Sequence, residues 1–315
     1  MNRICILGGT GFVGQRLVAI LSNQGYACRV ISRHPHRHNN LKICPNTELV
    51  KASQLDTASL RQIFSGCHAV INLIGILNES ATHSFRKVHI ELVDSVVDAA
   101  IKSGSTRLLH MSALNADAGK GSSEYLRTKG EGENRAHTHG SSALQVTSFR
   151  PSVIFGSEDS LFNRFATLLQ LSPWLFPLAA PNCRFAPVYV DDVANAFALA
   201  LTKPETVGRH YNLCGPEVYS LKKLIEYTSK QIGVRTIVLP LNDRLSRIQA
   251  FLLGHIPGQP FTLDNYLSLQ TDSICKQNGL IELGIQPQSI HSHVPGYLAK
   301  KNYRSRFDRY RRLRA

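Results

Sequence analysis

The feature that most constrains the fold of this chain is a strand, a glycine-rich turn and a helix that follow one another near its start. Residues 4 to 14 are Ile-Cys-Ile-Leu-Gly-Gly-Thr-Gly-Phe-Val-Gly, and we expect the helix over residues 15 to 24. The glycines fit two registers, which begin at Gly8 or Gly9 and share Gly11 and Gly14. In either register one glycine permits the turn, one lets backbone N–H groups approach a pyrophosphate, and one lets the helix pack on the strand. The stretch therefore predicts a dinucleotide site, with expected contacts from Gly8, Gly9, Thr10, Gly11, Phe12, Val13 and Gly14.

A basic residue stands where an NAD site usually has a carboxylate. No Asp or Glu precedes Glu48, and the second expected strand, over residues 27 to 31, ends in Ser32 and Arg33. The usual carboxylate, about 20 residues after the glycines, binds the ribose 2'-hydroxyl, whereas a guanidinium suits a 2'-phosphate. We therefore predict NADP(H) over NAD(H), with Ser32 and Arg33 as contacts. The alternative is that Arg33 belongs to a solvated basic loop.

The loop after Arg33 contains three alternating histidines, His34, His36 and His38. A metal site usually needs further ligands close by, and this loop offers only the thiol of Cys44 and is interrupted by Pro35. We therefore expect no metal site.

Length and composition bound the class of protein. A chain of 315 residues with 43% hydrophobic residues can form one large domain or a domain with a second lobe. Its seven cysteines are odd in number and contain no C-x-x-C pair, which predicts reduced thiols without a disulfide or zinc framework. The first strand begins within three residues and no apolar run reaches 18 residues, so we expect neither a signal peptide nor a membrane span. These features favour a cytoplasmic protein.

The first half of the chain alternates short apolar strands with helical stretches, the pattern of a doubly wound parallel sheet. Further strands are expected over residues 49 to 51, 69 to 74 and 107 to 111, with a long helix over residues 85 to 103. Asp56 follows the third strand and could contact the adenine end of a cofactor or cap the next helix. The fourth strand ends at the sheet edge where ligands bind in such folds, which adds Asn72, Ile74 and Gly75 to the expected cofactor contacts.

Beyond residue 154 the strand and helix pattern loosens. We expect a Rossmann domain over residues 1–155 with a return segment at about 184–215, a smaller C-terminal substrate lobe over 156–298, and a basic tail over 299–315. The lobe contains a strongly apolar run over residues 161 to 178, which includes the only tryptophan, Trp174. This run is explained either by ordinary core packing or by a pocket for an apolar substrate.

The net charge of +14 is concentrated at the C-terminus. Residues 300–315 hold eight Lys or Arg residues against Asp308, and Tyr303, Phe307 and Tyr310 are spaced to share one helical face. Such a segment could lie on an anionic membrane, dock on a protein complex or remain a solvated tail. The chain shows no nucleic-acid recognition motif, so we do not expect that partner.

The candidate catalytic residues are Ser112, Tyr125 and Lys129. Tyr-x-x-x-Lys on a helix places both side chains on one face, where the ammonium lowers the pKa of the phenol and suits it to exchange a proton at a carbonyl. A serine hydroxyl can orient the substrate oxygen. The spacing also occurs at Tyr219 and Tyr297. Tyr125 is favoured because it begins a helix 13 residues after Ser112, which follows the fifth strand.

Taken together, these motifs resemble the extended short-chain dehydrogenase/reductase superfamily over nearly the whole chain. The resemblance rests on residues 8–14, Ser112, residues 125–129, the segment 150–156 (Arg-Pro-Ser-Val-Ile-Phe-Gly) and the segment 187–193 (Pro-Val-Tyr-Val-Asp-Asp-Val). Segments 70–75, 112–117 and 159–165 are most similar to an atypical branch. That branch includes the NADPH-binding accessory subunit of respiratory complex I and its bacterial relatives.

The resemblance implies a bound dinucleotide and assigns Ser112, Tyr125 and Lys129 to the superfamily's catalytic positions, with Tyr125 and Lys129 also at the cofactor. It implies catalysis less firmly, because members of this branch hold NADPH as a structural element. The chain also has His89 where the superfamily's catalytic tetrad has an asparagine.

Two hypotheses follow from these features. In the first, the protein is an NADP-dependent oxidoreductase that acts on an apolar carbonyl substrate, such as a quinone-like or lipid-like molecule. In the second, it is a binding module stabilised by NADPH that docks on a membrane or respiratory assembly at the inner face of a membrane. A third alternative, a nucleotide-sugar epimerase or dehydratase, usually depends on NAD, which the missing carboxylate argues against.

Overall fold

The computed structural model describes residues 2–140, 143–172 and 174–298, and these residues form two compact units. Unit 1 contains residues 2–151, 190–213 and 276–286. Unit 2 contains residues 152–189, 214–275 and 287–298. The segment 276–286 of unit 1 was not anticipated from the sequence.

Unit 1 is built on a seven-stranded sheet in which every paired strand runs parallel. The strand order is β11-β6-β5-β4-β1-β2-β3, so the order reverses between β1 and β4. At that reversal Leu7 of β1 is paired with Ile31 of β2 on one side and with Asn72 of β4 on the other. The strands are β1 (Arg3–Leu7), β2 (Ala27–Ser32), β3 (Thr47–Lys51), β4 (Ala69–Asn72), β5 (Arg107–Met111), β6 (Gln145–Pro151) and β11 (His210–Leu213).

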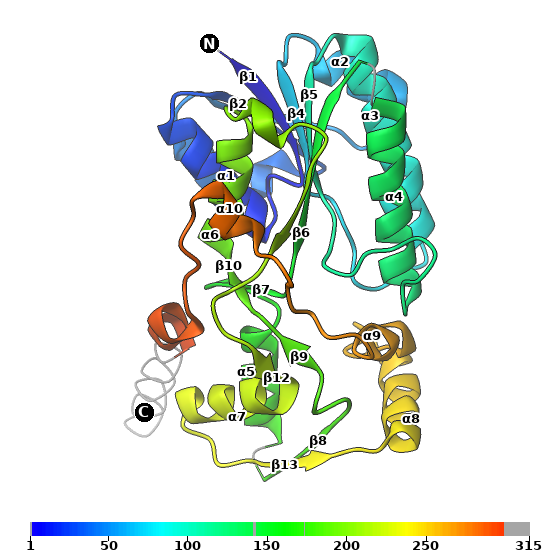
Figure 1. Cartoon of the computed structure of the whole chain (residues 1–315), viewed down its shortest axis with the longest axis vertical. Helices are drawn as coiled ribbons and strands as arrows, with labels where there is room; N and C mark the ends of the chain where they lie inside the picture. The colour runs from blue at the N-terminus through cyan, green and yellow to red at the C-terminus, as the bar shows by residue number, and fades with distance from the viewer. Residues whose placement is uncertain (1, 141–142, 173, 299–315) are drawn as a thin grey trace. The chain divides into compact units, whose positions relative to one another are not determined.

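Helices cover both faces of this sheet, with α1, α6 and α10 on one side and α2, α3 and α4 on the other (Figure 1). A parallel sheet requires such crossovers, and apolar side chains on both faces form the core. Fully buried Leu60, Phe64 and Val97 pack from the helices against Val70 and Leu108 of the sheet. The helices are α1 (Phe12–Asn23), α2 (Thr57–Phe64), α3 (Leu92–Ser103), α4 (Glu124–Gly140), α6 (Val190–Ala200) and α10 (Gly279–Leu283), with short 3₁₀ turns at Pro35–Arg37, Asn39–Ile43 and Pro204–Thr206.

Unit 2 combines four labelled helices and a further helical segment over residues 290–298 with three two-stranded sheets, which pair β10 with β7, β12 with β9, and β13 with β8. Its core contains Phe155, Phe162, Leu224, Ile225 and Val294, all nearly inaccessible to solvent. The elements are β7 (Ile154–Phe155), α5 (Phe162–Leu171), β8 (Leu175–Leu178), β9 (Arg184–Phe185), β10 (Val188–Tyr189), β12 (Tyr219–Ser220), α7 (Leu221–Ile232), β13 (Ile237–Pro240), α8 (Asp243–Gly254) and α9 (Leu263–Ser268).

The expectation that all cysteines are reduced thiols is wrong for one pair. Cys214 and Cys275 form a disulfide in unit 2, with their Cα atoms 6.0 Å apart across 61 residues of sequence. Cys5, Cys28, Cys44, Cys67 and Cys183 are free. The pair was not foreseen because its spacing matches no local motif, and only the packing of unit 2 brings the two residues together.

The doubly wound fold class is confirmed by the parallel sheet and its crossover helices. The expected helix over residues 85 to 103 is confirmed, and Lys87–Glu91 forms a π-helical turn within it, before α3. The apolar run over residues 161 to 178 holds α5 and β8. The basic tail lies outside the described residues. Within the described ranges, no helix has both the length and the apolar content to cross a bilayer.

Candidate functional site

The glycine-rich turn between β1 and α1 has the backbone geometry that a pyrophosphate site needs. Gly8 has φ +76°, a conformation that favours glycine, and its carbonyl accepts a hydrogen bond from Gly11 N–H at 3.0 Å. A Cβ built on Gly14 would lie 2.2 Å from the Gly8 oxygen and 2.5 Å from the Gly9 Cα, so only glycine fits. The positive φ of Gly8 supports the register that begins at this residue.

The start of α1 is suited to an anion. Its N-cap, Gly11, supplies no side-chain hydrogen bond, and the first turn of the helix carries no acidic side chain. The first N–H groups of a helix point outward without intrahelical acceptors, and the helix dipole favours negative charge there. The turn and helix therefore fit a dinucleotide pyrophosphate.

A pocket of about 530 Å³ opens at the carboxyl ends of the strands in unit 1. Six of the predicted contact residues line it: Gly8, Thr10, Ser32, Arg33, Ile74 and Gly75. Gly9, Gly11, Phe12, Val13, Gly14, Asp56, Asn72, Tyr125 and Lys129 are not part of this lining. Ligands bind at such a reversal of strand order in doubly wound sheets, so the pocket lies where a dinucleotide is expected.

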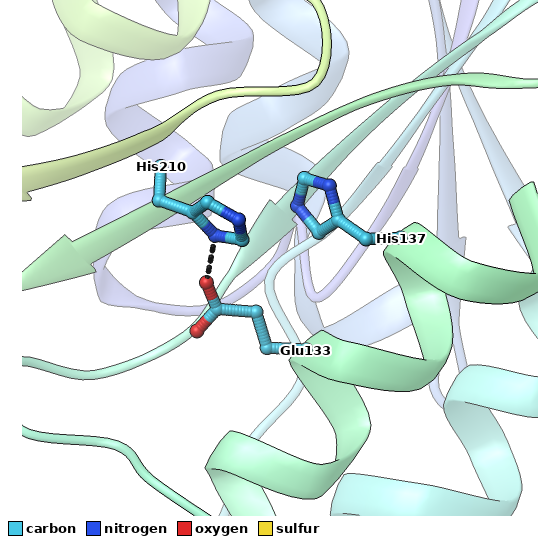
Figure 2. Close-up of side chains that lie close together, drawn as sticks. All are labelled: Glu133, His137 and His210. Atoms are coloured by element: carbon cyan, nitrogen blue, oxygen red, sulfur yellow. Dashed lines mark hydrogen bonds and ion pairs between the residues drawn. The ribbon is translucent and has the colours of Figure 1, made fainter. Parts of the chain in front are cut away.

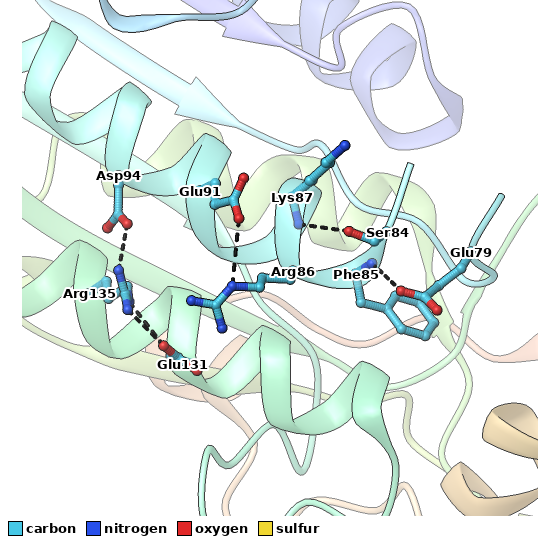
Figure 3. Close-up of polar contacts among 9 residues, drawn as sticks. All are labelled: Glu79, Ser84, Phe85, Arg86, Lys87, Glu91, Asp94, Glu131 and Arg135. Carbon is cyan, nitrogen blue, oxygen red and sulfur yellow. Dashed lines mark hydrogen bonds and ion pairs between the residues drawn. The ribbon is translucent and has the colours of Figure 1, made fainter. Parts of the chain in front are cut away.

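The sequence reasoning missed one wall of this pocket, which contains Thr82, His83, Lys87 and Glu91. Figure 3 shows how this wall is held: Glu79 accepts a hydrogen bond from Phe85 N–H at 2.8 Å, and Ser84 accepts one from Lys87 N–H at 3.3 Å. The wall follows β4 at the carboxyl edge of the sheet. This position after β4 was the sequence signal by which these residues could have been predicted as pocket residues.

The same helical segment is tied to α4. Arg135 of α4 bonds to Asp94 of α3 at 2.6 Å and to Glu131 of its own helix at 2.9 Å (Figure 3). These partly exposed pairs each contribute little stability, but they connect the two helices that carry the pocket wall and the candidate catalytic residues.

Two predicted contacts have structural partners of their own. Asp56 is the N-cap of α2 and accepts a hydrogen bond from Ser59 N–H at 2.9 Å, which lowers the pKa of its carboxyl. The capping interpretation of Asp56 is therefore confirmed. Asn72 is buried and accepts a hydrogen bond from Ile74 N–H at 3.1 Å, which shapes the chain as it leaves β4. Direct contact of Asp56 or Asn72 with a cofactor stays a prediction.

Tyr125 and Lys129 lie one turn apart on α4. Lys129 is buried and donates a hydrogen bond from Nζ to the Met111 carbonyl at the end of β5, at 2.5 Å. Burial lowers the pKa of Lys129 to about 8, against the raising effect of Glu133. A Cβ built on Gly75 would lie 3.6 Å from the ammonium, so Lys129 reaches the carboxyl edge of the sheet.

His89 occupies the π-helical turn and contacts the same region. Its Nε2 accepts a hydrogen bond from Ile76 N–H at 3.1 Å, so the neutral ring carries its proton on Nδ1 and donates to Thr128 Oγ1 at 3.0 Å. Burial, with the charge of Lys129 adding to it, lowers the pKa of His89 to about 3. The ring is T-shaped against Tyr125, with centroids 5.5 Å apart. His89 is therefore a neutral side chain that holds the loop after β4 beside Tyr125.

Ser112 is placed differently from Tyr125. Its side chain is buried, and among the described residues its Oγ has no hydrogen-bond partner. The hydroxyl lies near the Glu133 carboxylate but outside normal hydrogen-bond geometry. The structure therefore brings Tyr125, Lys129 and His89 together, and it places Ser112 toward a buried carboxylate.

That carboxylate is the centre of a buried polar network. Arg150 Nε donates to both oxygens of Glu133, at 2.9 and 3.0 Å. His210 Nδ1 hydrogen-bonds to the same carboxylate (Figure 2). Burial by itself raises the pKa of Glu133, but the bonds from His210 and Arg150 outweigh it and lower the pKa to about 2. His137 stacks near His210, with centroids 4.1 Å apart, and its Nε2 lies 3.0 Å from Ser148 Oγ.

Glu133, His137 and His210 have ligand atoms within 4.8 Å of one another, a spacing that a metal ion could bridge (Figure 2). Two features favour a hydrogen-bonded network instead. Arg150 donates to both carboxylate oxygens, and the two imidazole planes are tilted by only 31°, so their in-plane lone pairs do not converge on one point. We therefore assign this cluster a structural role between α4 and the sheet.

The chain is similar in sequence to several known proteins. A sequence profile of the NAD dependent epimerase/dehydratase family matches residues 4–214. The mitochondrial NADH dehydrogenase (ubiquinone) 1 alpha subcomplex subunit 9 of Rattus norvegicus is 28% identical over 299 residues, which cover 90% of this chain and 76% of that protein. A ceramide reductase of Caulobacter vibrioides is 28% identical over 194 residues, which cover 61% of this chain and 58% of that protein.

Among solved structures, the dTDP-glucose 4,6-dehydratase DesIV of Streptomyces venezuelae, with NAD bound, superposes with a TM-score of 0.74. The match covers 96% of this chain and 97% of that chain at 18% identity. This likeness concerns the fold alone.

Proposed function

The chain belongs to the NAD dependent epimerase/dehydratase family, and from that premise we propose that it binds NADP(H) and reduces the carbonyl of an apolar substrate. The observation that carries this proposal is the placement of Tyr125 and Lys129. The buried Lys129 ammonium bonds to the end of β5 beside Gly75, and Tyr125 lies one turn away on α4. The Lys129 ammonium lies beside Gly75, a residue of the pocket lining, and the Tyr125 ring packs against His89, and this arrangement supports the proposal.

Arg33 supports NADP(H) over NAD(H). Its side chain lines the pocket at the end of β2, and no acidic residue occurs between Met1 and Thr47 to bind a ribose 2'-hydroxyl. A guanidinium forms charge-assisted hydrogen bonds with phosphate oxygens. Ser32 is buried beside it and accepts a hydrogen bond from His34 N–H at 3.2 Å, which fixes the turn that carries Arg33.

When bound, the cofactor supplies the hydride that a carbonyl reduction needs. Tyr125 donates the accompanying proton to the substrate oxygen, and the ammonium of Lys129 stabilises the phenolate that remains. His89 keeps the loop after β4 in place through its bond to Ile76. We assign Ser112 the orientation of the substrate oxygen, as its sequence position suggests.

The proposed substrate class is a quinone-like or lipid-like carbonyl compound. The sequence similarity to a ceramide reductase supports a lipid-like substrate.

A second candidate is a structural role for bound NADPH in a protein that docks on a respiratory complex at the inner face of a membrane. The observation that favours it is Ser112, whose hydroxyl is buried near Glu133. The similarity to a complex I subunit over 90% of this chain also supports it. A nucleotide-sugar epimerase or dehydratase is a third candidate: the family profile supports it, whereas the solved dehydratase, at 18% identity, supports the fold alone.

The test follows the fluorescence of NADPH bound to the full chain while quinones or long-chain ketones are added. Loss of the signal in the wild type, with retention in Tyr125→Phe, would establish the reductase. Tyr219→Phe is a matched control, because Tyr219 and Lys223 repeat the motif spacing in unit 2. A bound signal that persists in the wild type with every substrate would refute turnover and favour the structural role.

A further inference from the structure

Helix α8 of unit 2 has its large apolar side chains on the outside. Leu245, Ile248, Phe251 and Leu252 are each about half or more exposed, with Phe251 at 61% and Leu252 at 60%. At 100° per residue these four side chains share one face of the helix. A helix that only packs on its own domain would turn such a face inward, so the exposed face indicates an external partner.

The inner face of α8 is formed by small residues. Ser246 and Ala250, one turn apart, are buried, and Ala250 packs in a cluster with Ala179 and Tyr266. Gln249 Nε2 also donates to the Pro177 carbonyl of β8 at 2.9 Å. These contacts fix the helix in unit 2 by its small-residue face, so its orientation follows from its own packing.

Further exposed apolar residues flank the helix in the sequence. Leu239 precedes α8, and Ile256 and Leu263 follow it, each between 45% and 47% exposed. Together with the four side chains of α8 they define what we call the α8 surface. Isolated exposed apolar residues are normal, but seven large ones within 25 residues of sequence are not.

The segment that carries the α8 surface has a small positive charge. Between Leu239 and Leu263 the chain has two basic residues, Arg244 and Arg247, and one acidic residue, Asp243. The Asp243 carboxylate is bound by Arg247 at 2.9 Å and by the Tyr266 hydroxyl. Arg244 is exposed, and helical spacing places it on the apolar face.

We propose that the α8 surface docks unit 2 on an anionic phospholipid bilayer, with α8 lying in the plane of the interface. Exposed Phe, Leu and Ile side chains combined with arginines are typical of helices that insert at the boundary between headgroups and acyl chains. The apolar side chains enter the acyl region and Arg244 reaches back to the phosphates. The 12 residues of α8 extend about 18 Å, which is too short to span a bilayer.

This inference does not require the cofactor to turn over, so it stands or fails separately from the proposed reductase. It also differs from docking through the basic tail, since the α8 surface is formed by residues 239–263 of unit 2. Variants of the α8 surface, made in the full chain, distinguish docking through this surface from docking through the basic tail.

The first experiment measures co-sedimentation of the full chain with vesicles of phosphatidylcholine, alone or with 30% phosphatidylglycerol. The wild type is expected to bind the anionic vesicles more strongly. Phe251→Ser with Leu252→Ser is expected to lower the partition coefficient at least about tenfold. Arg244→Gln should lower it about fivefold on anionic vesicles only, since one basic residue near such a surface contributes about 1 kcal/mol.

The matched control is Ile43→Ser with Ile281→Ser in unit 1, where these side chains are 84% and 64% exposed. It removes similar apolar exposure from other parts of the chain and should leave the partition coefficient unchanged. The matched charge control is Arg61→Gln at an exposed position of α2. All variants alter exposed side chains, so circular dichroism and thermal unfolding should match the wild type.

A second measurement places a reporter on the surface itself. The chain has one tryptophan, so Phe251→Trp in a Trp174→Phe background gives a single probe on α8. Vesicle binding should shift its emission to the blue, and brominated acyl chains should quench it.

Three results would overturn the proposal: a wild type that stays in the supernatant with both vesicle types, a double serine variant that binds like the wild type, or a probe whose emission does not change on sedimentation. The first result, combined with self-association that the double serine variant loses, would assign the α8 surface to contact between copies of this chain.

Discussion

Replacing Arg33 by glutamine tests the cofactor preference at its proposed origin. Arg33 lines the pocket at the end of β2, and the described residues provide it with no ion pair. A hydrogen bond to a charged group contributes about 1.5–3 kcal/mol, and because Arg33 is exposed the lower end applies. Since 1.4 kcal/mol corresponds to a factor of ten, we expect Arg33→Gln to weaken NADPH binding about tenfold. NADH lacks the 2'-phosphate, so its binding should change by less than twofold.

The assay is fluorescence titration of both cofactors at fixed ionic strength, because the interaction is screened by salt. Arg37→Gln is the matched control, since Arg37 is exposed in the same basic loop and lies outside the pocket lining. Weakening of NADPH and NADH by the same factor would refute the assignment of Arg33 to the phosphate. Equal effects of Arg33→Gln and Arg37→Gln would show a general effect of loop charge.

Three further predictions concern the turn, the buried network and a cap. Gly14→Ala places a Cβ 2.2 Å from the Gly8 oxygen, so NADPH should no longer raise the melting temperature of this variant. The pKa of Glu133 is lowered from 4.5 to about 2, so its charge stabilises the fold by about 3 kcal/mol above pH 4.5, and this contribution is lost as the pH falls through 2. Urea unfolding should therefore show that Glu133→Gln is less stable than the wild type at pH 6, and the difference should shrink toward pH 2. Asp56→Ala removes the cap of α2 and should lower the free energy of unfolding by about 1 kcal/mol. If this variant also loses more than twofold in NADPH affinity, Asp56 contacts the cofactor.

Local sequence patterns predicted much of unit 1. The expected strand over residues 107 to 111 coincides with β5, and the expected strand over residues 27 to 31 falls within β2. The π-helical turn at residues 87–91 of the long helix was not predicted, because the apolar spacing is similar in α- and π-helical turns. His89 was noted as a departure, but its neutral state depends on burial and on the charge of Lys129, which is distant in sequence.

The sequence by itself determined the dinucleotide turn, the parallel sheet and the pairing of Tyr125 with Lys129, because each of these follows from patterns among residues that are close together in the sequence. Only the tertiary structure decided which side chains share a buried environment. It placed Ser112 near Glu133, joined Cys214 to Cys275, and turned the large apolar residues of α8 outward. The physical reason is that burial and hydrogen-bond partners depend on contacts between segments far apart in sequence, which no local spacing records.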